Sequence, residues 1–264
     1  MLENWVIEAE KLYKEGYSYT SIGKILNKNR QTISKHIKAI EKGEEIFNPN
    51  KLNSNMNINA FENIDTEEKA YWLGFMYADG YVSKKRNEVS FSIKELYHIE
   101  RFKRFLNINN KIQKKIKDNK FVIYSISFRS KKIKEDLINN GCVPNKSKIL
   151  VFPNEYQVPR NLLNHFIRGY IDGDGCITTS NNGKGISLEI LGSKEFLLGL
   201  TKIDLFKINK LYSFNHSDIK RVSYSGSKAM NALKYIYNNA TIYLERKYER
   251  YQKFMPSLVK ATED

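Results

Sequence analysis

The sequence has little cysteine, no long apolar run and no basic leader, and each absence excludes a class of protein. Its two cysteines, Cys142 and Cys176, cannot form the disulfide framework of a small secreted domain. No Cys/His spacing typical of a zinc site occurs. No apolar run approaches the roughly 20 residues that span a bilayer. The N-terminus is acidic where a secretory signal is basic. We therefore expect a soluble, cytoplasmic protein without a membrane partner.

Acidic residues are also in deficit. Lysine and arginine number 44 against 29 aspartates and glutamates, for a net charge of +15. Residues 1–62 hold nine basic and eight acidic groups, whereas residues 63–264 hold 35 and 21, so the excess lies in the larger part. Such a field attracts polyanions, and nucleic acid is the first partner to consider. The alternative is a chain from a lysine- and asparagine-rich proteome. Hydrophobic residues make up 41%, enough for a packed core.

Residues 1–45 are predicted to form a small all-α domain. Apolar spacing indicates helices over 2–15 and 31–40, with a middle helix that opens at Ser18 or Thr20 and ends at Leu26. Two short helices joined by a tight turn are typical of a helix-turn-helix, and Gly23 lies where the helices approach closely. The third helix would present side chains suited to DNA bases and phosphates: Gln31, Thr32, Lys35 and His36. A plain three-helix interaction module is the alternative.

Residues 46–62 are expected to be a linker. Six of the twelve residues 48–59 are asparagine, which disfavours regular structure. The rest of the chain has the pattern of a duplication, with units over 63–150 and 151–264. When Asp79 is aligned with Asp174, strand patterns follow at 88–93 and 185–190, helical stretches at 95–107 and 193–204, and a second strand pair in each unit. A helix then opens at Ser130-Lys131 or Ser227-Lys228. Each unit is predicted to be αββαββα.

Each unit opens on a helix with small residues on one face. Gly74 and Ala78 are four apart in the first helix, and Gly169 and Gly173 in the second, so both pairs lie on one helical face. A glycine inside a helix costs about 1 kcal/mol relative to alanine, so its use suggests close contact. We expect the two helices to pack against each other about a pseudo-twofold axis.

Both helices end in Asp-Gly, at Asp79-Gly80 and Asp174-Gly175. Glycine is an expected helix terminator, but a carboxylate opposes the helix dipole there by about 0.3–1 kcal/mol. Two carboxylates brought together also repel each other. A divalent cation offsets both penalties, and hard carboxylate oxygens suit Mg²⁺. A turn-forming Asp-Gly is the alternative for either copy alone.

The stretches WLGFMYADG (72–80) and IRGYIDGDG (167–175) resemble the motif of the LAGLIDADG homing endonucleases. GCVPNKSKILVFP (141–153) and ATIYLERKYERYQKF (240–254) are similar to further stretches of the bacterial and phage branch. The resemblance covers roughly residues 63–254. It implies an α+β fold in which two pseudo-symmetric units form a saddle of antiparallel sheets over DNA. It also implies Mg²⁺-dependent double-strand cleavage, by two or more divalent ions, at a long asymmetric target.

The resemblance also suggests roles for individual residues. Asp79 and Asp174 become the catalytic, metal-binding pair, with the backbone carbonyls of Ala78 and Gly173 as further ligands. Asp172 has no counterpart, because Tyr77 holds the matching place. Lys131 and Lys228 are candidate catalytic residues near the scissile phosphates, although both can equally be solvated. Basic residues on or near predicted strands would face DNA: Lys84, Lys85, Arg86, Lys114, Lys115, Lys117, Lys220 and Arg221.

Two other interpretations remain open. One is a non-cleaving binder on the same fold, either a transcription regulator or a maturase that binds intron RNA; loss of a motif carboxylate would mark it, and both are present. The other is an interaction protein with an incidental basic surface. Because the chain starts with methionine and does not end in His-Asn, we expect a free-standing protein, by analogy encoded in an intron or between genes of a phage or bacterium. As a single chain with two motifs, it is expected to be a monomer.

Overall fold

The computed structural model describes residues 4–43, 55–118, 120–180, 185–207, 210–213 and 218–255. Contacts divide the chain into two compact units, Met1–Ser54 and Asn55–Asp264. Residues 44–54, which include residues 46–54 of the expected linker, lie outside the described residues. Residues 55–62, also expected in the linker, belong to the second unit, where Ala60 and Phe61 are fully buried in its core. The linker is shorter than expected because Ala60 and Phe61, which follow the asparagines in sequence, are apolar and pack into the core.

The first unit is a three-helix domain made of α1 (Asn4–Lys14), α2 (Tyr19–Ile25) and α3 (Arg30–Glu41). Side chains outside each of the last two helices cap their free N–H groups: Ser18 accepts from the Ser21 amide and Asn29 from the Gln31 amide. A small core forms from Ala9, Ile22, Ile33 and Ile37. A Cβ on Gly23 would lie 2.6 Å from the Lys28 carbonyl oxygen, so the turn requires glycine there. The expected three helices are present.

The second unit repeats one pattern twice. Its first half consists of α4 (Glu67–Ala78), β1 (Tyr81–Val82), β2 (Glu88–Ile93), α5 (Leu96–Leu106), β3 (Gln113–Lys117), β4 (Phe121–Arg129) and α6 (Lys131–Asn139). Its second half consists of α7 (Leu163–Asp174), β5 (Gly175–Ser180), β6 (Gly185–Gly192), α8 (Lys194–Leu200), β7 (Tyr212–Ser213), β8 (Lys220–Ser225) and α9 (Gly226–Tyr237). Each half is αββαββα, as predicted, and α10 (Glu245–Gln252) follows. The second closing helix starts earlier than expected, at Gly226.

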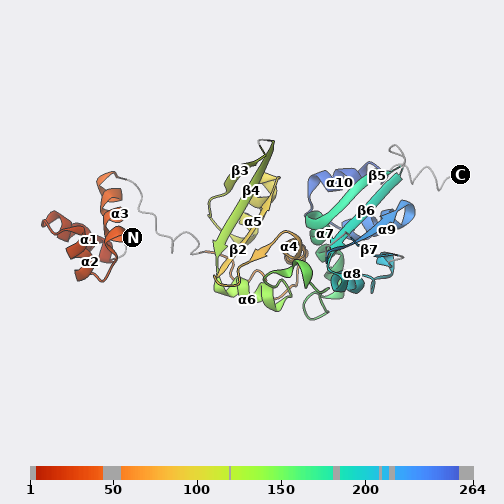
Figure 1. Cartoon of the computed structure of the whole chain (residues 1–264), viewed down its shortest axis with the longest axis horizontal. Helices are drawn as coiled ribbons and strands as arrows, with labels where there is room; N and C mark the ends of the chain where they lie inside the picture. Colours follow the sequence, from red (N-terminus) through yellow and green to blue (C-terminus); the bar gives the residue numbers. More distant parts are fainter. Residues whose placement is uncertain are drawn as a thin grey trace. The chain divides into compact units, whose positions relative to one another are not determined.

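Each half builds one four-stranded antiparallel sheet, with strand orders β1-β2-β4-β3 and β5-β6-β8-β7 (Figure 1). Successive side chains of a strand point to opposite faces of its sheet, so the alternation of buried residues shows which face is turned to the core. Along β2, Val89, Phe91 and Ile93 point to the core, and along β6 the even-numbered residues 186–192 do so. Ser90 pairs with Ser127 on the opposite face of the first sheet. Each sheet therefore has one apolar face covered by helices and one polar open face.

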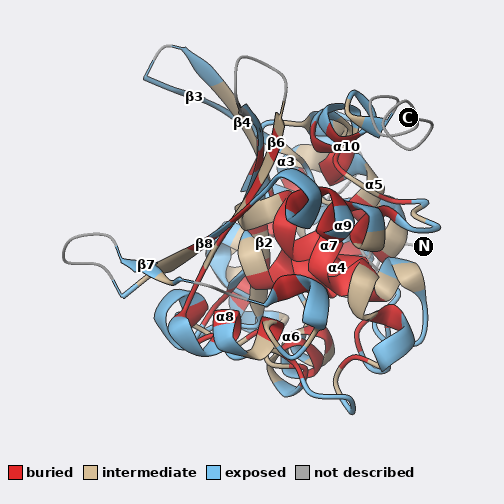
Figure 2. Cartoon of the chain, turned by 90° about the vertical axis from the view of Figure 1, so that its right-hand side faces the viewer, coloured by how far each residue is buried: buried red, intermediate tan, exposed pale blue. Residues whose placement is uncertain are grey.

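Helices α4 and α7 form the centre of this unit, packed side by side between the two sheets. Figure 2 shows them as its most buried elements, while the outer strands β3 and β7 carry exposed residues. Trp72 and Tyr71 of α4 and Tyr170 of α7 are among the large side chains that are almost completely buried. The fold is α+β with two pseudo-symmetric halves. In the described part of the chain, no helix is long and apolar enough to cross a bilayer.

Candidate active site at the ends of two packed helices

Glycines bring the two central helices into backbone contact. A Cβ on Gly74 would overlap the Phe166 carbonyl oxygen, and one on Gly169 would overlap that of Tyr71, both well inside the 3.0 Å that real Cβ atoms keep. Phe166 and Tyr71 occupy matching places in the two helices, so the contact is reciprocal. A Cβ on Gly173 would collide with the side chain of Ala78. The expected interface of Gly74, Ala78, Gly169 and Gly173 is where the helices meet.

The packed helices bring the two aspartates to one place. Asp79 is the C-cap of α4, and Asp174 is the last residue of α7. A Cβ on Gly173 would lie 3.3 Å from Asp79 Oδ2, which shows how closely this carboxylate approaches the other helix. The expected convergence of Asp79 and Asp174 is therefore present in the geometry.

The glycines after the aspartates serve another purpose than expected. Neither Gly80 nor Gly175 has the positive φ of a left-handed helix terminator. Instead, a Cβ on Gly175 would lie 2.6 Å from the carbonyl oxygen of Ile171, and Gly80 meets Met76 in the same way. Close approach of the following strand to the helix end requires glycine at both places.

The electrostatics of the pair are those of two carboxylates pressed together. Burial, followed by the negative charge of Asp174, raises the pKa of Asp79 to about 6. Burial also raises the pKa of Asp174. Lys146 and Lys247 act in the opposite direction on the pKa of both carboxyls. The site thus concentrates negative charge that nearby cations partly offset.

Lys146 and Lys247 are the functional candidates that sequence reasoning missed. Lys146 Nζ donates to the carbonyl oxygens of Ala78, at 2.9 Å, and Gly80, at 2.6 Å. Lys247 Nζ donates to those of Ile171, Asp172 and Gly175, at 2.6, 2.7 and 2.6 Å. The last carbonyls of a helix lack partners within it, and a lysine that binds them also places positive charge at the negative end of the helix dipole. Each motif helix is closed by one lysine.

Both lysines are buried, which is rare for this residue. Burial lowers the pKa of Lys247 to about 8, although Asp172 and Asp79 hold its proton in place. The sequence did contain a signal, because Lys146 and Lys247 lie in the two stretches, 141–153 and 240–254, whose similarity to the family lies outside the motif helices. Nothing in local periodicity marks a lysine as buried, so the sequence pattern does not distinguish either lysine from a surface residue.

The lysines expected from the sequence lie elsewhere. Lys131 opens α6 with its side chain 73% exposed, and it pairs with Glu135 at 3.8 Å. Lys228 is an exposed residue of α9. The cations that act on the two aspartates are Lys146, Lys247 and, for Asp79, Arg246. The structure does not bring Lys131 or Lys228 into this set.

Oxygen atoms suited to a hard cation gather at the helix ends. Besides the two carboxylates, the Ala78 carbonyl is present, but it already accepts from Lys146 and has one further lone pair to offer. Among the described residues, no cluster of three or more His, Cys, Asp or Glu side chains is arranged to hold a metal. The donor set that fits Mg²⁺ is therefore a carboxylate pair completed by backbone oxygens and water, which Mg²⁺ usually retains.

The basic residues of the first sheet divide between its faces. Lys84, Lys85 and Arg86 lie in the exposed turn between β1 and β2. On β3, Lys115 pairs with Ile123 and Lys117 with Phe121, which puts both on the open face. Lys114 pairs with Tyr124, which pairs in turn with core-facing Ile93, so Lys114 points to the helix side of this edge strand.

The second sheet and the N-terminal domain hold the remaining candidates. Arg221 lies on the open face of β8, 3.3 Å from Glu189, whereas Lys220 pairs with buried Gly192 and so lies on the other face. Gln31 and Lys35 of α3 are exposed, while Thr32 and His36 are half-buried. His36 contacts the Trp5 ring edge-on, so it also has a packing role.

Comparison with known proteins agrees with this fold. A family model described as "LAGLIDADG-like domain" matches residues 66–142 and 161–234, more than half of the chain. The solved complex of the homing endonuclease I-WcaI with its DNA recognition sequence is 15% identical, with a TM-score of 0.51 over 78% of this chain and 98% of that one. The I-SmaMI LAGLIDADG homing endonuclease bound to cleaved DNA is 12% identical, with a TM-score of 0.47 over 76% and 91%.

A similar likeness extends to the LAGLIDADG meganuclease I-AabMI bound to uncleaved DNA, at 13% identity and a TM-score of 0.46 over 73% of this chain and 91% of that one. No curated protein matches the sequence. At 15% identity the I-WcaI complex supports the fold alone. The family model covers both repeats and their motif helices. The chain belongs to the LAGLIDADG-like domain family and has the two-unit fold of its homing endonucleases.

Proposed function

We propose that this chain is a site-specific endonuclease that hydrolyses both strands of duplex DNA with Mg²⁺ held by Asp79 and Asp174. The observation that carries the proposal is the convergence of these two carboxylates at the junction of the glycine-packed helices. Burial and mutual repulsion raise the pKa of Asp79 to about 6, a cost that a non-catalytic helix end has no reason to bear. A binder without catalysis needs neither carboxylate.

The residues around the pair have distinct roles in this proposal. Divalent cations shared by two carboxylates lower the pKa of a bound water and stabilise the leaving oxygen. Asp79 and Asp174 supply the anionic ligands, and the backbone oxygens of Ala78 and Gly173 are available beside them. Lys146 and Lys247 fix the helix ends that hold the aspartates, and their charge favours an incoming phosphate.

The open faces of the two sheets are the proposed DNA-binding surface. Lys115 and Lys117 of the first sheet and Arg221 of the second lie on these faces, with Lys84, Lys85 and Arg86 at a neighbouring turn. Cations here neutralise phosphates, and the serine side chains between them suit contacts to bases. The two halves differ in sequence, so the target is long and asymmetric. Both halves lie in one chain, so a monomer suffices.

The three-helix domain is proposed to add a second DNA contact. Its α2 and α3 have the lengths and tight turn of a helix-turn-helix, and Gln31 and Lys35 lie exposed at the start of α3, the part that reads bases in such domains. It would extend the recognition site beyond the region that the two sheets cover.

The test is incubation of the full chain with a library of random DNA duplexes, with Mg²⁺ or with EDTA, followed by sequencing of the cut ends. We expect double-strand breaks at one family of related sites, only with the metal. Retention of duplexes without any cut ends would overturn the nuclease proposal and favour a regulator. Selective retention of structured RNA in a parallel library would favour a maturase.

A further inference from the structure

The two halves of the helix pair match in position but differ in chemistry. At four pairs of matching places, one helix carries a polar side chain where the other carries a hydrophobic or aromatic one. On α4 the polar residues are Glu67, against Leu162, and Tyr71, against Phe166; on α7 they are Arg168, against Leu73, and Asp172, against Tyr77. Glu67 and Tyr71 are four apart on α4, and Arg168 and Asp172 are four apart on α7, so each pair lies on one helical face. Together they form a strip, called here the polar strip, in which Tyr71, Arg168 and Asp172 are buried and Glu67 is partly exposed.

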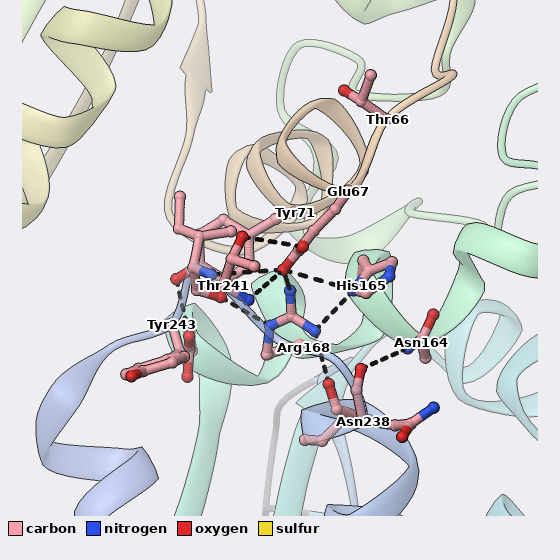
Figure 3. Close-up of polar contacts among 12 residues, drawn as sticks. Thr66, Glu67, Tyr71, Asn164, His165, Arg168, Asn238, Thr241 and Tyr243 are labelled. Carbon is pink, nitrogen blue, oxygen red and sulfur yellow. Dashed lines mark hydrogen bonds and ion pairs between the residues drawn. The ribbon is translucent and has the colours of Figure 1, made fainter.

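The polar strip binds the last turn of α9 and the backbone that follows it (Figure 3). Arg168 is fully buried, and its guanidinium donates to the carbonyl oxygens of Ile236, at 2.6 Å, and Ile242, at 2.8 Å. Arg168 also pairs with Glu67 at 2.6 Å. Glu67 in turn accepts from the Thr241 amide at 2.7 Å and from the Thr241 hydroxyl at 2.9 Å.

Asp172 completes the strip nearest to the active site. Its Oδ2 accepts from the Tyr71 hydroxyl at 2.7 Å and from the Leu244 amide at 2.8 Å, and the residue is 1% exposed. Three residues after Leu244 comes Lys247, which closes α7. The strip therefore holds the segment 236–244 that carries Lys247 to the ends of the motif helices.

The opposite half holds its lysine by other means. Tyr77, at the place that matches Asp172, donates from its hydroxyl to the Asn140 carbonyl oxygen at 2.5 Å. Its ring packs edge-on against Phe166, with centroids 4.9 Å apart. The segment 140–146 then leads to Lys146. The same helical position thus anchors the lysine-bearing segment in each half, by a buried carboxylate in one and by an aromatic ring and hydroxyl in the other.

We propose that Asp172 positions Lys247 and that Tyr77 positions Lys146. Because the two residues differ in chemistry, a substitution at one changes the position of its own lysine and leaves the other lysine in place. Each residue thereby governs the cutting of one DNA strand. This inference rests on the proposed endonuclease function. Packing alone does not require the polar strip, because Leu73, Leu162 and Phe166 fill the matching places without it. Burying Arg168 and Asp172, with Glu67 partly buried beside them, carries a desolvation cost that an apolar set avoids.

The first test measures lysine position without any DNA or metal. The full-length wild type and the variants Asp172→Leu, Asp172→Asn and Tyr77→Phe are acetylated with limiting acetic anhydride, and each lysine is quantified by mass spectrometry. Exposed Lys207, 72% of whose side chain is accessible, is the internal standard. We expect Asp172→Leu to raise the acetylation rate of Lys247 by about tenfold or more through local opening, while Lys146 is unchanged.

The matched variants separate position from packing. Asp172→Asn keeps an oxygen acceptor for Leu244 and Tyr71, so it should restore most of the protection of Lys247. Tyr77→Phe removes one hydroxyl and should expose Lys146 rather than Lys247. Thr241→Val, at an exposed residue, removes the hydroxyl that donates to Glu67 and so loosens the same segment. We expect a smaller rise in the acetylation rate of Lys247, and this variant replaces Asp172→Leu if that protein does not fold.

The second test measures strand-resolved cleavage of a selected duplex labelled differently on its two strands. Asp172→Leu and Tyr77→Phe should slow opposite strands, and each should accumulate nicked product. Unchanged protection of Lys247 in folded Asp172→Leu would overturn the proposal, as would equal slowing of both strands by both variants. If the wild type does not cut DNA, the endonuclease proposal fails alone, because the acetylation pattern still decides the positioning roles.

Discussion

Lys247 Nζ lies 2.6 Å from the carbonyl oxygen of Gly175, and the same distance separates Lys146 Nζ from that of Gly80. Gly80 and Gly175 directly follow the two aspartates, so the lysine contacts repeat across the pseudo-twofold axis. The candidate site is therefore built from four charged groups in two matched pairs, each pair at the end of one motif helix. Its integrity depends on residues far apart in sequence.

Replacing either lysine with a neutral side chain should disable catalysis more than folding. Lys146→Met and Lys247→Met keep much of the side-chain volume but remove the charge that offsets the aspartates. We expect cleavage to fall by about 100-fold or more, the scale of losing one preorganised stabilising group. Single-turnover cleavage at saturating enzyme measures this loss, and thermal melting shows whether the unpaired carbonyls also weaken the fold.

Lys131→Met provides the control for this prediction. Its side chain is exposed and pairs with nearby Glu135, so cleavage should change by less than about threefold, as for an ordinary surface substitution. A large loss in Lys131→Met together with normal cutting in Lys146→Met would restore the expectation drawn from sequence and remove the role given to the buried lysine.

The contact between Gly173 and Ala78 at the helix interface predicts that exchanging the two side chains preserves stability. A Cβ on Gly173 meets the Cβ of Ala78, so Gly173→Ala should destabilise the fold by about 1–3 kcal/mol through overpacking. The double variant that adds Ala78→Gly exchanges the two side chains and should recover most of that loss. Urea unfolding measures both. Additive rather than compensating effects would mean that the two residues do not touch.

The N-terminal domain should contribute affinity without affecting chemistry. Gln31→Ala combined with Lys35→Ala changes exposed positions at the start of α3 and leaves its core of Ile33 and Ile37 intact. We expect a shorter nuclease-protection footprint and weaker binding, with an unchanged single-turnover rate at saturation. An unaltered footprint would assign the domain to some other partner.

His98 should make stability depend on pH. Burial lowers its pKa from 6.5 to about 3, with Arg101, Arg246 and Lys247 acting in the same direction. Below pH 6.5 this histidine binds a proton in the unfolded chain, whereas in the folded chain it stays neutral down to about pH 3. The free energy of unfolding therefore falls as the pH drops through this window, by at most about 1.4 kcal/mol per pH unit for this group.

The matched variant for this effect is His98→Gln, which can still donate to the Tyr71 hydroxyl that His98 Nε2 contacts at 3.1 Å. Other groups titrate over the same range, including Asp172, whose pKa burial raises to about 6. The difference between wild type and His98→Gln isolates the histidine. Parallel stability curves from pH 7 to pH 4 would contradict a buried neutral His98.

Much of the fold follows from local pattern. The strand expected over 88–93 matches β2 (Glu88–Ile93), because alternation of apolar and polar residues is a property of the strand itself. The glycine-faced helices were also predictable, since Gly74 and Gly169 report contact through their spacing. The structural reason for Gly80 and Gly175 could not be predicted, because the close approach of a strand to a helix end depends on the path of the chain.

The polar parts of the site were harder to predict. Lys146 and Lys247 look like surface lysines in sequence, and only the return of their segments to the motif helices buries them. Asp172 was conspicuous for lacking a counterpart, but its partner Leu244 lies 72 residues away. Contacts of this range leave no periodic trace in a single sequence.

The cleavage rates of Asp79→Asn and Asp174→Asn on a selected duplex, measured alongside DNA binding, test the central claim most directly. Asparagine preserves shape but removes the charge that binds the metal. We expect both variants to bind DNA like wild type and to cut at least about 1,000-fold more slowly, the consequence of losing several kcal/mol of stabilisation by the metal site. Full cleavage of both strands by either variant would contradict the account.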